Sequence, residues 1–569
     1  MPPSIAFLIN GRAAPDAVVR SDIPRVALVV LLHLGALGLM AWSEVGLVPK
    51  VVFLLTWGLL NFFWLALLRR PAVAAALSLL TIVVLILLSR LKYEIIWMTA
   101  NFLDLWIVNA DAVKFLLSVR PDLYHTAVIA LVLTLPALAA LWWIDPLRVR
   151  LRAALAGFAL CLAGLVSVAL AFPDEEWEAF YGDSYVSKFA RSGVTAISQL
   201  ATRGYLESDV SVADRLRTLP GATCAPTARP PHIILVHDES SFDIRAVPGI
   251  KVPPGYGGHF QSFDGKRRHF IAEGAGGPSW YTEYNVLAGL SARSFGRFAY
   301  YVTQIAAGRV ERGLPAALRR CGYRTFSLYP ALGAFMSARN FQTSIGVDSF
   351  IDQGALGTNR IEPDRFYYDA ALRMIARERD KGPMFLFVYL AQNHYPWNHR
   401  LRPELTPNWK DPGNALEVDE YLRRQVMSFG DYAALLDRLK RDFPEESFLL
   451  IRYGDHQPEF ASMILEPSLD EAGINRRLTA YDPRYFTTYY AIDAVNFRPV
   501  DLSSALDTVE GPYLPLIAQE AAGLPLDPSF VEQKHILQRC KGLFYACSAG
   551  AEARRFNRLL IDAGLIKGL

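Results

Sequence analysis

The chain has 569 residues, too many for one ordinary domain, and 52% of them are hydrophobic. Its formal net charge of +3 is too small to indicate a nucleic-acid partner. We find no fixed-period repeat and no low-complexity tract. Nearly all the long apolar runs lie in the first third of the chain, and the remainder has the composition of a globular domain. The sequence therefore predicts a membrane part followed by a folded polar part.

Five apolar segments are long enough to cross about 30 Å of hydrocarbon. They cover residues 25–42, 51–68, 72–89, 124–143 and 152–172. The first of them begins too late for a cleavable signal peptide, and four others follow it. We therefore predict a five-helix transmembrane domain over residues 25–172, preceded by a cytoplasmic N-terminus at residues 1–24.

Lys and Arg predict the orientation of these helices, because both residues favour the cytoplasmic side. Arginines precede the first helix and occupy the second and fourth connections: Arg12, Arg20, Arg25, Arg69, Arg70, Arg148, Arg150 and Arg152. Residues 90–123 mix aromatic, apolar and charged side chains, which predicts interfacial helices with Trp97 and Trp106 at headgroup level. An odd number of spans then places the C-terminal part outside the cytoplasm.

Cysteine usage agrees with that location. The C-terminal part contains four cysteines, an even number in an oxidising compartment. Cys540 and Cys547 are close enough in sequence to close a small loop, which leaves Cys224 and Cys321 as the other pair. Four free thiols are the alternative.

Residues 173–230 are predicted to be a connector with a helix at 187–216. From His232 onward, short apolar runs alternate with amphipathic segments, which is typical of an α/β sheet. The predicted strands cover residues 233–236, 325–329, 384–390, 447–451 and 486–494, and the predicted helices 312–320, 366–379 and 430–442. We assign residues 231–569 to one extracytoplasmic catalytic domain.

Polar groups follow three of these strands, and functional groups of such sheets collect at the carboxyl ends of strands. The first strand leads into residues 237–241, the third into 392–396, and the fourth into Asp455 and His456. An Asp beside a His at a strand end suits a divalent metal. A simple turn is the alternative for the ending that contains Asp455 and His456.

A glycine-rich loop at residues 274–278 opens a predicted helix, with Ser279 near its N-cap. A helix N-terminus attracts anions such as phosphate. A hydroxyl bound to a divalent metal loses its proton more readily, so Ser279 is a candidate nucleophile. Thr282 is the second candidate, and a plain N-cap is the alternative for Ser279.

Four motifs appear in order, at residues 237–241, 276–284, 393–397 and 453–456. With five spans before them, they resemble the lipoteichoic acid synthase and phosphoethanolamine transferase group of the sulfatase/alkaline-phosphatase superfamily. The resemblance implies a multi-pass α-helical membrane domain plus an extracytoplasmic α/β sulfatase-like domain. It covers nearly the whole chain.

The resemblance also implies roles for particular residues. The family's single divalent metal, Zn²⁺ or Mn²⁺ with Mg²⁺ as a further candidate, would be held by Glu239, Ser279, Asp455 and His456. Ser279 stands where the family has a Thr nucleophile, and this departure leaves Thr282 open as an alternative. The headgroup-binding His of the family matches His394, and its substrate-binding Arg matches Arg339.

The implied activity is transfer of a phosphoglycerol or phosphoethanolamine headgroup from a phospholipid to an envelope glycan or glycolipid, through a covalent Ser or Thr intermediate. The expected setting is a monomer in a bacterial inner membrane with its catalytic domain in the periplasm. A phospholipid phosphodiesterase, a sulfatase-type hydrolase and a non-catalytic lipid- or glycan-binding protein are the alternatives. A sulfatase proper is disfavoured because Ser279 lacks the x-Pro-x-Arg sequence that formylglycine conversion needs. The sequence leaves donor headgroup and acceptor open.

Overall fold

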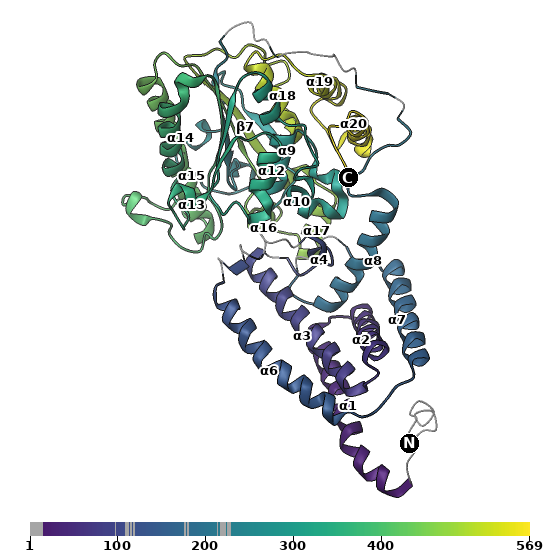
Figure 1. Cartoon of the computed structure of the whole chain (residues 1–569). Helices are drawn as coiled ribbons and strands as arrows, with labels where there is room; N and C mark the ends of the chain where they lie inside the picture. The colour runs from purple at the N-terminus through teal and green to yellow at the C-terminus, as the bar shows by residue number, and fades with distance from the viewer. Residues whose placement is uncertain are drawn as a thin grey trace. The chain divides into compact units, whose positions relative to one another are not determined.

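The computed structural model describes residues 15–96, 98–107, 113, 116–117, 120–175, 178, 181–212, 214–216, 224 and 229–569. The chain divides into two compact units, Met1–Thr202 and Arg203–Leu569 (Figure 1). Residues 1–14 of the predicted cytoplasmic segment, Trp97 of the predicted interfacial stretch and the loop at 217–223 lie outside the described residues. The predicted connector is shared between the two units.

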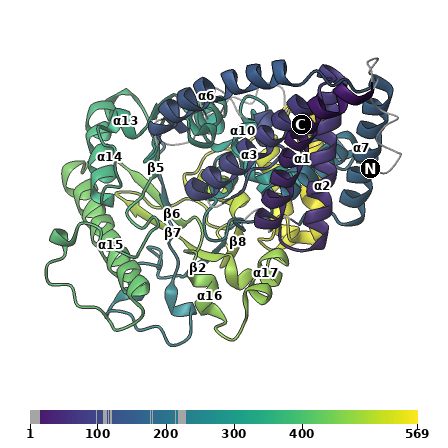
Figure 2. The same ribbon diagram turned by 90° about the horizontal axis from the view of Figure 1, so that it is seen from below.

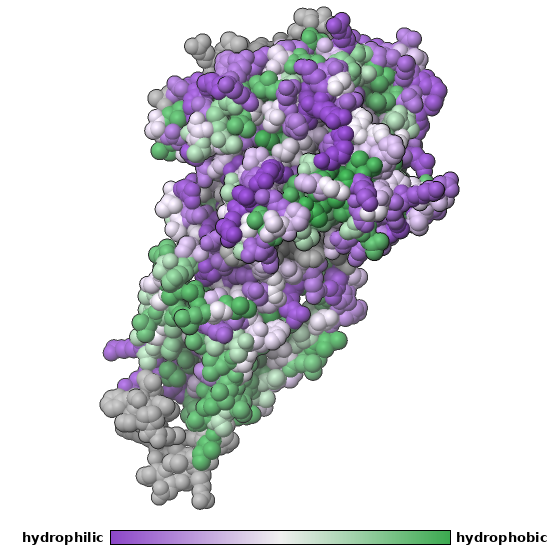
Figure 3. Space-filling view, turned by 180° about the vertical axis from the view of Figure 1, so that it is seen from behind, coloured by the Kyte–Doolittle hydropathy of each residue, from purple (hydrophilic) through white to green (hydrophobic). Residues whose placement is uncertain are grey.

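The first unit is helical. Its helices are α1 (Pro15–Ser43), α2 (Leu47–Leu68), α3 (Pro71–Ile96), α4 (Asp104–Ile107), α6 (Asp122–Ile144), α7 (Leu151–Ala171) and α8 (Tyr185–Arg203). Five of them are long and apolar enough to cross a membrane, over Arg25–Ser43, Leu47–Leu68, Pro71–Glu94, Asp122–Ile144 and Leu151–Ala171. Hydrophobic residues gather over this unit in Figure 3. The prediction of five long apolar helices in this part of the chain is confirmed.

Small residues let two of these helices approach closely. A Cβ atom on Gly157 of α7 would lie 2.5 Å from the ring of Phe62 on α2, and one on Gly58 would lie 2.7 Å from the sulfur of Cys161. Helices in lipid associate through this kind of close packing. The helix predicted at 187–216 is shorter than expected: α8 ends at Arg203 because Gly204 adopts a φ of +73°, which ends an α-helix.

The second unit is built on an eight-stranded sheet with the order β4-β3-β5-β1-β6-β7-β2-β8. The strands are β1 (His232–Asp238), β2 (Arg268–Ile271), β3 (Arg324–Leu328), β4 (Ser349–Ile351), β5 (Met384–Tyr389), β6 (Phe448–Gly454), β7 (Thr487–Val495) and β8 (Thr508–Glu510). From β4 to β6 all pairs are parallel, whereas β7 runs antiparallel to β6 and β2. Figure 2 shows β5, β6, β7, β2 and β8 in succession. All five predicted strands are confirmed.

Helices cover the sheet so that β1 and β6 are buried along their whole length. They are α9 (Ser279–Ala288), α10 (Val302–Ala306), α11 (Leu314–Arg320), α12 (Ala338–Ser344), α13 (Gln353–Leu356), α14 (Asp364–Glu378), α15 (Leu416–Asp442), α16 (Ala461–Leu465), α17 (Glu471–Thr479), α18 (Leu514–Ala521), α19 (Pro528–Cys540) and α20 (Ala551–Asp562). Alternate strand residues such as Ile234 and Val236 pack into one core with α14 and α15. Strands buried on both faces are continuous apolar runs, which made them recognisable in the sequence.

The structure corrects one prediction about this unit and confirms another. α15 begins at Leu416, well before the predicted residue 430, because its first half buries Glu420 against Arg423 and Arg424 and therefore looks polar in sequence. Both expected disulfides, Cys224–Cys321 and Cys540–Cys547, are confirmed.

Candidate active site

The strand order brings two of the predicted motifs to one edge of the sheet. β1 and β6 are parallel neighbours, and Asp238 pairs with Gly454, so Glu239 and Asp455 leave the sheet side by side. Gly454 is needed there because a Cβ atom at this position would lie 1.7 Å from the carbonyl oxygen of Ser241. The close approach of the two strand ends thus depends on a residue without a side chain.

The glycine-rich loop delivers Ser279 to the same edge. Ser279 is the first residue of α9. The backbone N–H of Gly276 donates to the carbonyl of Gln457 over 3.2 Å, which ties this loop to the segment that carries His456. Gly276 has a φ of +69°, a left-handed conformation that glycine adopts without strain.

Glu239, Ser279, Asp455 and His456 form one compact cluster. The hydroxyl of Ser279 lies 3.1 Å from Nε2 of His456 and donates to Oε2 of Glu239 over 3.3 Å. Nε2 of His456 also lies 3.5 Å from Oε1 of Glu239 and 3.4 Å from Oδ2 of Asp455. Each of the four residues is at most 7% exposed. We call this set the strand-end cluster.

Neighbouring groups fix the orientation of these side chains. Nδ1 of His456 lies 2.8 Å from the carbonyl oxygen of Gln457. Because a carbonyl only accepts, Nδ1 carries the hydrogen, and the lone pair of Nε2 in the neutral ring faces the cluster. Ser240 donates its backbone N–H to Oδ1 of Asp455 over 2.7 Å and its hydroxyl to Oε1 of Glu239 over 2.8 Å.

The strand-end cluster attracts positive charge. Burial disfavours protonation of His456, but the charge of Asp455 and the hydrogen bond and charge of Glu239 outweigh it and raise the His456 pKa to about 9. Burial acts to raise the pKa of Asp455, yet His456 and His237 lower it on balance. The two carboxylates therefore favour a cation between them.

His237 is a member of this site that the sequence analysis did not assign to it. Its Nε2 lies 3.1 Å from Oδ2 of Asp455, and its Nδ1 lies 2.8 Å from the hydroxyl of Tyr453. His237, Glu239 and Asp455 each offer a ligand atom within 4.8 Å of the others. If the Tyr453 hydroxyl donates to Nδ1, Nε2–H holds Asp455 in place, as imidazoles and carboxylates around metal sites do. The signal in the sequence is its place two residues before Glu239, on the same face of the strand.

Thr282 occupies a different position from Ser279. It is fully buried, and its hydroxyl donates to the backbone carbonyl of Asp455 over 2.7 Å. Thr282 thus braces the main chain behind the strand-end cluster.

The other two candidates lie outside the strand-end cluster. His394 is exposed on the loop after β5, where its Nδ1 lies 2.7 Å from the carbonyl of Tyr395. Asn393 beside it donates to the carbonyl of Ser240 over 3.4 Å, which links this loop to the end of β1. Arg339 is engaged elsewhere: its guanidinium donates to Asp352 over 2.5 Å, and its side chain is 45% exposed.

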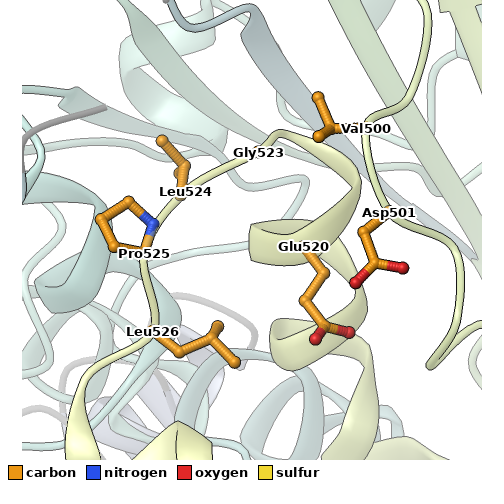
Figure 4. Close-up of a pocket in the computed structure, with 7 residues that line it drawn as sticks. All are labelled: Val500, Asp501, Glu520, Gly523, Leu524, Pro525 and Leu526. Carbon is orange, nitrogen blue, oxygen red and sulfur yellow. The ribbon is translucent and has the colours of Figure 1, made fainter. Parts of the chain in front are cut away.

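A separate cavity of about 350 Å³ lies in the C-terminal part of the second unit (Figure 4). It is lined by Val500, Asp501, Glu520 and residues 523–526. Lys534 forms ion pairs with both carboxylates of this lining. Their charge is thus partly neutralised, and the cavity lacks the histidine and hydroxyl of the strand-end cluster.

Comparisons with known proteins find a family model and a relative that match parts of the chain. The sulfatase family model matches residues 277–485. The capsular polysaccharide biosynthesis protein RkpI of Rhizobium meliloti (strain 1021) is 30% identical over 254 residues, which span 42% of this chain and 44% of that protein.

Solved structures resemble the chain at low identity. The phosphoglycerol transferase GacH of Streptococcus pyogenes, in complex with sn-glycerol-1-phosphate, has a TM-score of 0.46 and 15% identity over 60% of this chain and 88% of that one. The lipooligosaccharide phosphoethanolamine transferase EptA of Neisseria meningitidis has a TM-score of 0.36 and 13% identity over 83% of this chain and 95% of that one. The residues that match the sulfatase family model lie within the second unit of this chain, which agrees with the resemblance of its sequence motifs.

Proposed function

We propose that this chain is a membrane-bound, metal-dependent phosphotransferase. It moves a phosphoglycerol or phosphoethanolamine headgroup from a phospholipid to an envelope glycan or glycolipid. The observation that carries the proposal is the position of Ser279. A hydroxyl at the start of a helix, within 3.3 Å of both a carboxylate and an imidazole nitrogen, is arranged as an activated nucleophile.

The residues present fit one divalent cation. Glu239, Asp455, His456 and Ser279 offer carboxylate, imidazole and hydroxyl donors, which suit Zn²⁺ or Mn²⁺, with Mg²⁺ as a further candidate. The raised pKa of His456 in the metal-free cluster reports the same demand for positive charge. When bound, such an ion stabilises negative charge on phosphoryl oxygens and lowers the pKa of a hydroxyl.

The protein's own groups then act in two steps. The Ser279 hydroxyl donates its hydrogen toward Oε2 of Glu239, which leaves oxygen lone pairs for attack on phosphorus. The Ser279–phosphorus bond forms, the bond to the diacylglycerol oxygen breaks, and that oxygen takes up the proton that Ser279 released. In the second step the oxygen of an acceptor hydroxyl forms the new bond to phosphorus, the bond to Ser279 breaks, and the acceptor's proton passes to the Ser279 oxygen and restores its hydroxyl. The N-terminus of α9 favours the anionic phosphoryl group throughout.

Two features support a lipid donor and a glycan acceptor. Five candidate spans would keep the chain at a membrane, where phospholipid is the abundant phosphodiester. The relative RkpI is described as a capsular polysaccharide biosynthesis protein, which supports a cell-surface polysaccharide as acceptor. We assign headgroup binding to the exposed His394. Arg339 is the second candidate for this role, and it would have to leave its ion pair with Asp352.

The test uses the full chain in lipid nanodiscs that contain phosphatidylglycerol or phosphatidylethanolamine with a radiolabelled headgroup. Without acceptor, we expect diacylglycerol release and one labelled headgroup on the protein. Ser279→Ala should form neither product, whereas Ser468→Ala, a change at an exposed serine of the same unit, should behave as wild type. Continuous release of label to water in the presence of glycan would establish a phosphodiesterase instead. Absence of diacylglycerol from both lipids would refute the proposal.

A further inference from the structure

Glu283 is a carboxyl group buried inside the second unit, four residues after Ser279 on α9. Neither it nor Gln342 of α12 is exposed. Oε1 of Glu283 accepts a hydrogen bond of 2.9 Å from Nε2 of Gln342. Among the described residues, Oε2 of Glu283 and Oε1 of Gln342 have no hydrogen-bond partner. Glu283 and Gln342 thus share one hydrogen bond, and each side chain keeps one acceptor oxygen that receives no hydrogen bond.

One proton on Oε2 of Glu283 supplies both missing interactions. A carboxylic acid and a primary amide are complementary: the amide N–H donates to the acid carbonyl, and the acid O–H donates to the amide carbonyl. A carboxylate at this position would instead be a buried charge beside an amide, with no cationic side chain of the described residues paired to it, which is costly. Burial, opposed by the hydrogen bond from Gln342, raises the pKa of Glu283 to about 8.

We propose that Glu283 is a neutral carboxylic acid in the native protein, paired with Gln342, and that this acid–amide pair is the positioning device for Ser279. The pair joins α9, which begins with Ser279, to α12. The role assigned to it rests on the proposed function of Ser279, whereas the protonation state of Glu283 does not.

The surroundings explain why the neutral form matters. Burial and the carboxyls of Glu283 and Glu239 raise the pKa of Tyr329. Burial and the carboxyls of Glu239, Asp455 and Glu283 also raise the pKa of Tyr389. Burial, Asp455 and Glu283 likewise raise the pKa of Tyr453. Each of these tyrosines thus interacts electrostatically with Glu283 and with a carboxyl of the strand-end cluster. A charge on Glu283 would add a third negative charge to the surroundings of an anionic phosphoryl group. A neutral acid holds the helix without that repulsion.

Substitutions at Glu283 and Gln342 distinguish a neutral Glu283 from an ionised one. Glu283→Gln keeps the shape and both hydrogen bonds with Gln342, so we expect headgroup transfer within about twofold of wild type. Glu283→Ala leaves the Gln342 amide unpaired and should lower kcat by about tenfold or more with KM nearly unchanged. The exchanged pair, Glu283→Gln with Gln342→Glu, should recover activity relative to Gln342→Glu alone. A merely space-filling role predicts no such recovery.

Two further readouts report the proton itself. Infrared difference spectra of wild type minus Glu283→Gln at neutral pH should show the carbonyl stretch of a protonated acid. The transfer rate of wild type should fall at alkaline pH as Glu283 ionises, and Glu283→Gln should lose that decline. Absence of the acid band, or a Glu283→Gln variant as impaired as Glu283→Ala, would overturn the inference. If no headgroup transfer is found for any variant, the infrared band and the thermal stabilities still decide the acid–amide pair separately from the proposed function.

Discussion

Replacing Thr282 by Val distinguishes the two hydroxyls at the start of α9. Thr282 is fully buried, and its hydroxyl donates to the carbonyl of Asp455 over 2.7 Å. Val preserves the shape of the side chain and removes only that donor. Leaving a buried carbonyl without its partner costs about 1–3 kcal/mol. We therefore expect Thr282→Val to lower the free energy of unfolding by that amount and still to form the covalent headgroup adduct.

Ser279→Ala should give the opposite result for the adduct. Loss of the Ser279 hydroxyl leaves Oε2 of the buried Glu239 without this donor, so stability should again fall by about 1–3 kcal/mol, while the adduct disappears. Thermal unfolding of the full chain in detergent measures the first quantity. Mass spectrometry of the peptide that contains residues 277–284 locates the adduct. An adduct on Thr282 would refute the assignment of Ser279 as the nucleophile. So would a Thr282→Val variant that folds stably but forms no adduct, together with a Ser279→Ala variant that still forms one.

Three other predictions concern charge. Because the pKa of His456 in the metal-free cluster is about 9, a cation must displace a proton below that pH. Apparent metal affinity should therefore rise about tenfold per pH unit up to pH ~9, and calorimetry in buffers of different ionisation enthalpy should detect about one released proton. The pKa of Glu283 lies near 8, above the 4.5 of an exposed Glu, so the unfolded chain loses this proton first as pH rises. The contribution of Glu283 to the free energy of unfolding should therefore fall by about 1.4 kcal/mol per pH unit between pH ~4.5 and ~8 and stay low above that range. Thermal unfolding of Glu283→Gln should lack this slope. Because Arg339 already pairs with Asp352 at an exposed site, Arg339→Ala should lower stability by at most about 1 kcal/mol and leave the donor KM little changed. A large rise in that KM would show that the ion pair opens to admit substrate.

The elements that could be predicted from sequence are those whose burial is complete. The five spans and the strands β1, β5 and β6 are continuous apolar runs, because lipid or packed helices surround them on every side. β2, β4 and β8 have three or four residues each and exist as strands through their pairing with neighbours. Their short sequences contain no apolar run that marks them.

The strand-end cluster was predictable for a related reason. Carboxyl ends of parallel strands meet at one edge, so Glu239 and Asp455 were expected together despite their separation in sequence. The long-range contacts made by α9 and by His237 were not predictable. Gln342 meets Glu283 across 59 residues, and His237 meets Asp455 across 218. Such pairs depend on the packing of whole helices and strands, which no local pattern encodes.

The charges of the site explain why one cation, and no more, is expected there. Glu239 and Asp455 contribute two negative charges, and in the metal-free cluster His456 responds with a raised pKa of about 9. A divalent cation would supply the positive charge that the proton on His456 otherwise provides, and the neutral imidazole would then present its Nε2 lone pair. If Glu283 were ionised, the surroundings would hold a third negative charge and favour further cations or exclude phosphate. A neutral Glu283, paired with Gln342, keeps the negative charge at the level that one divalent ion balances.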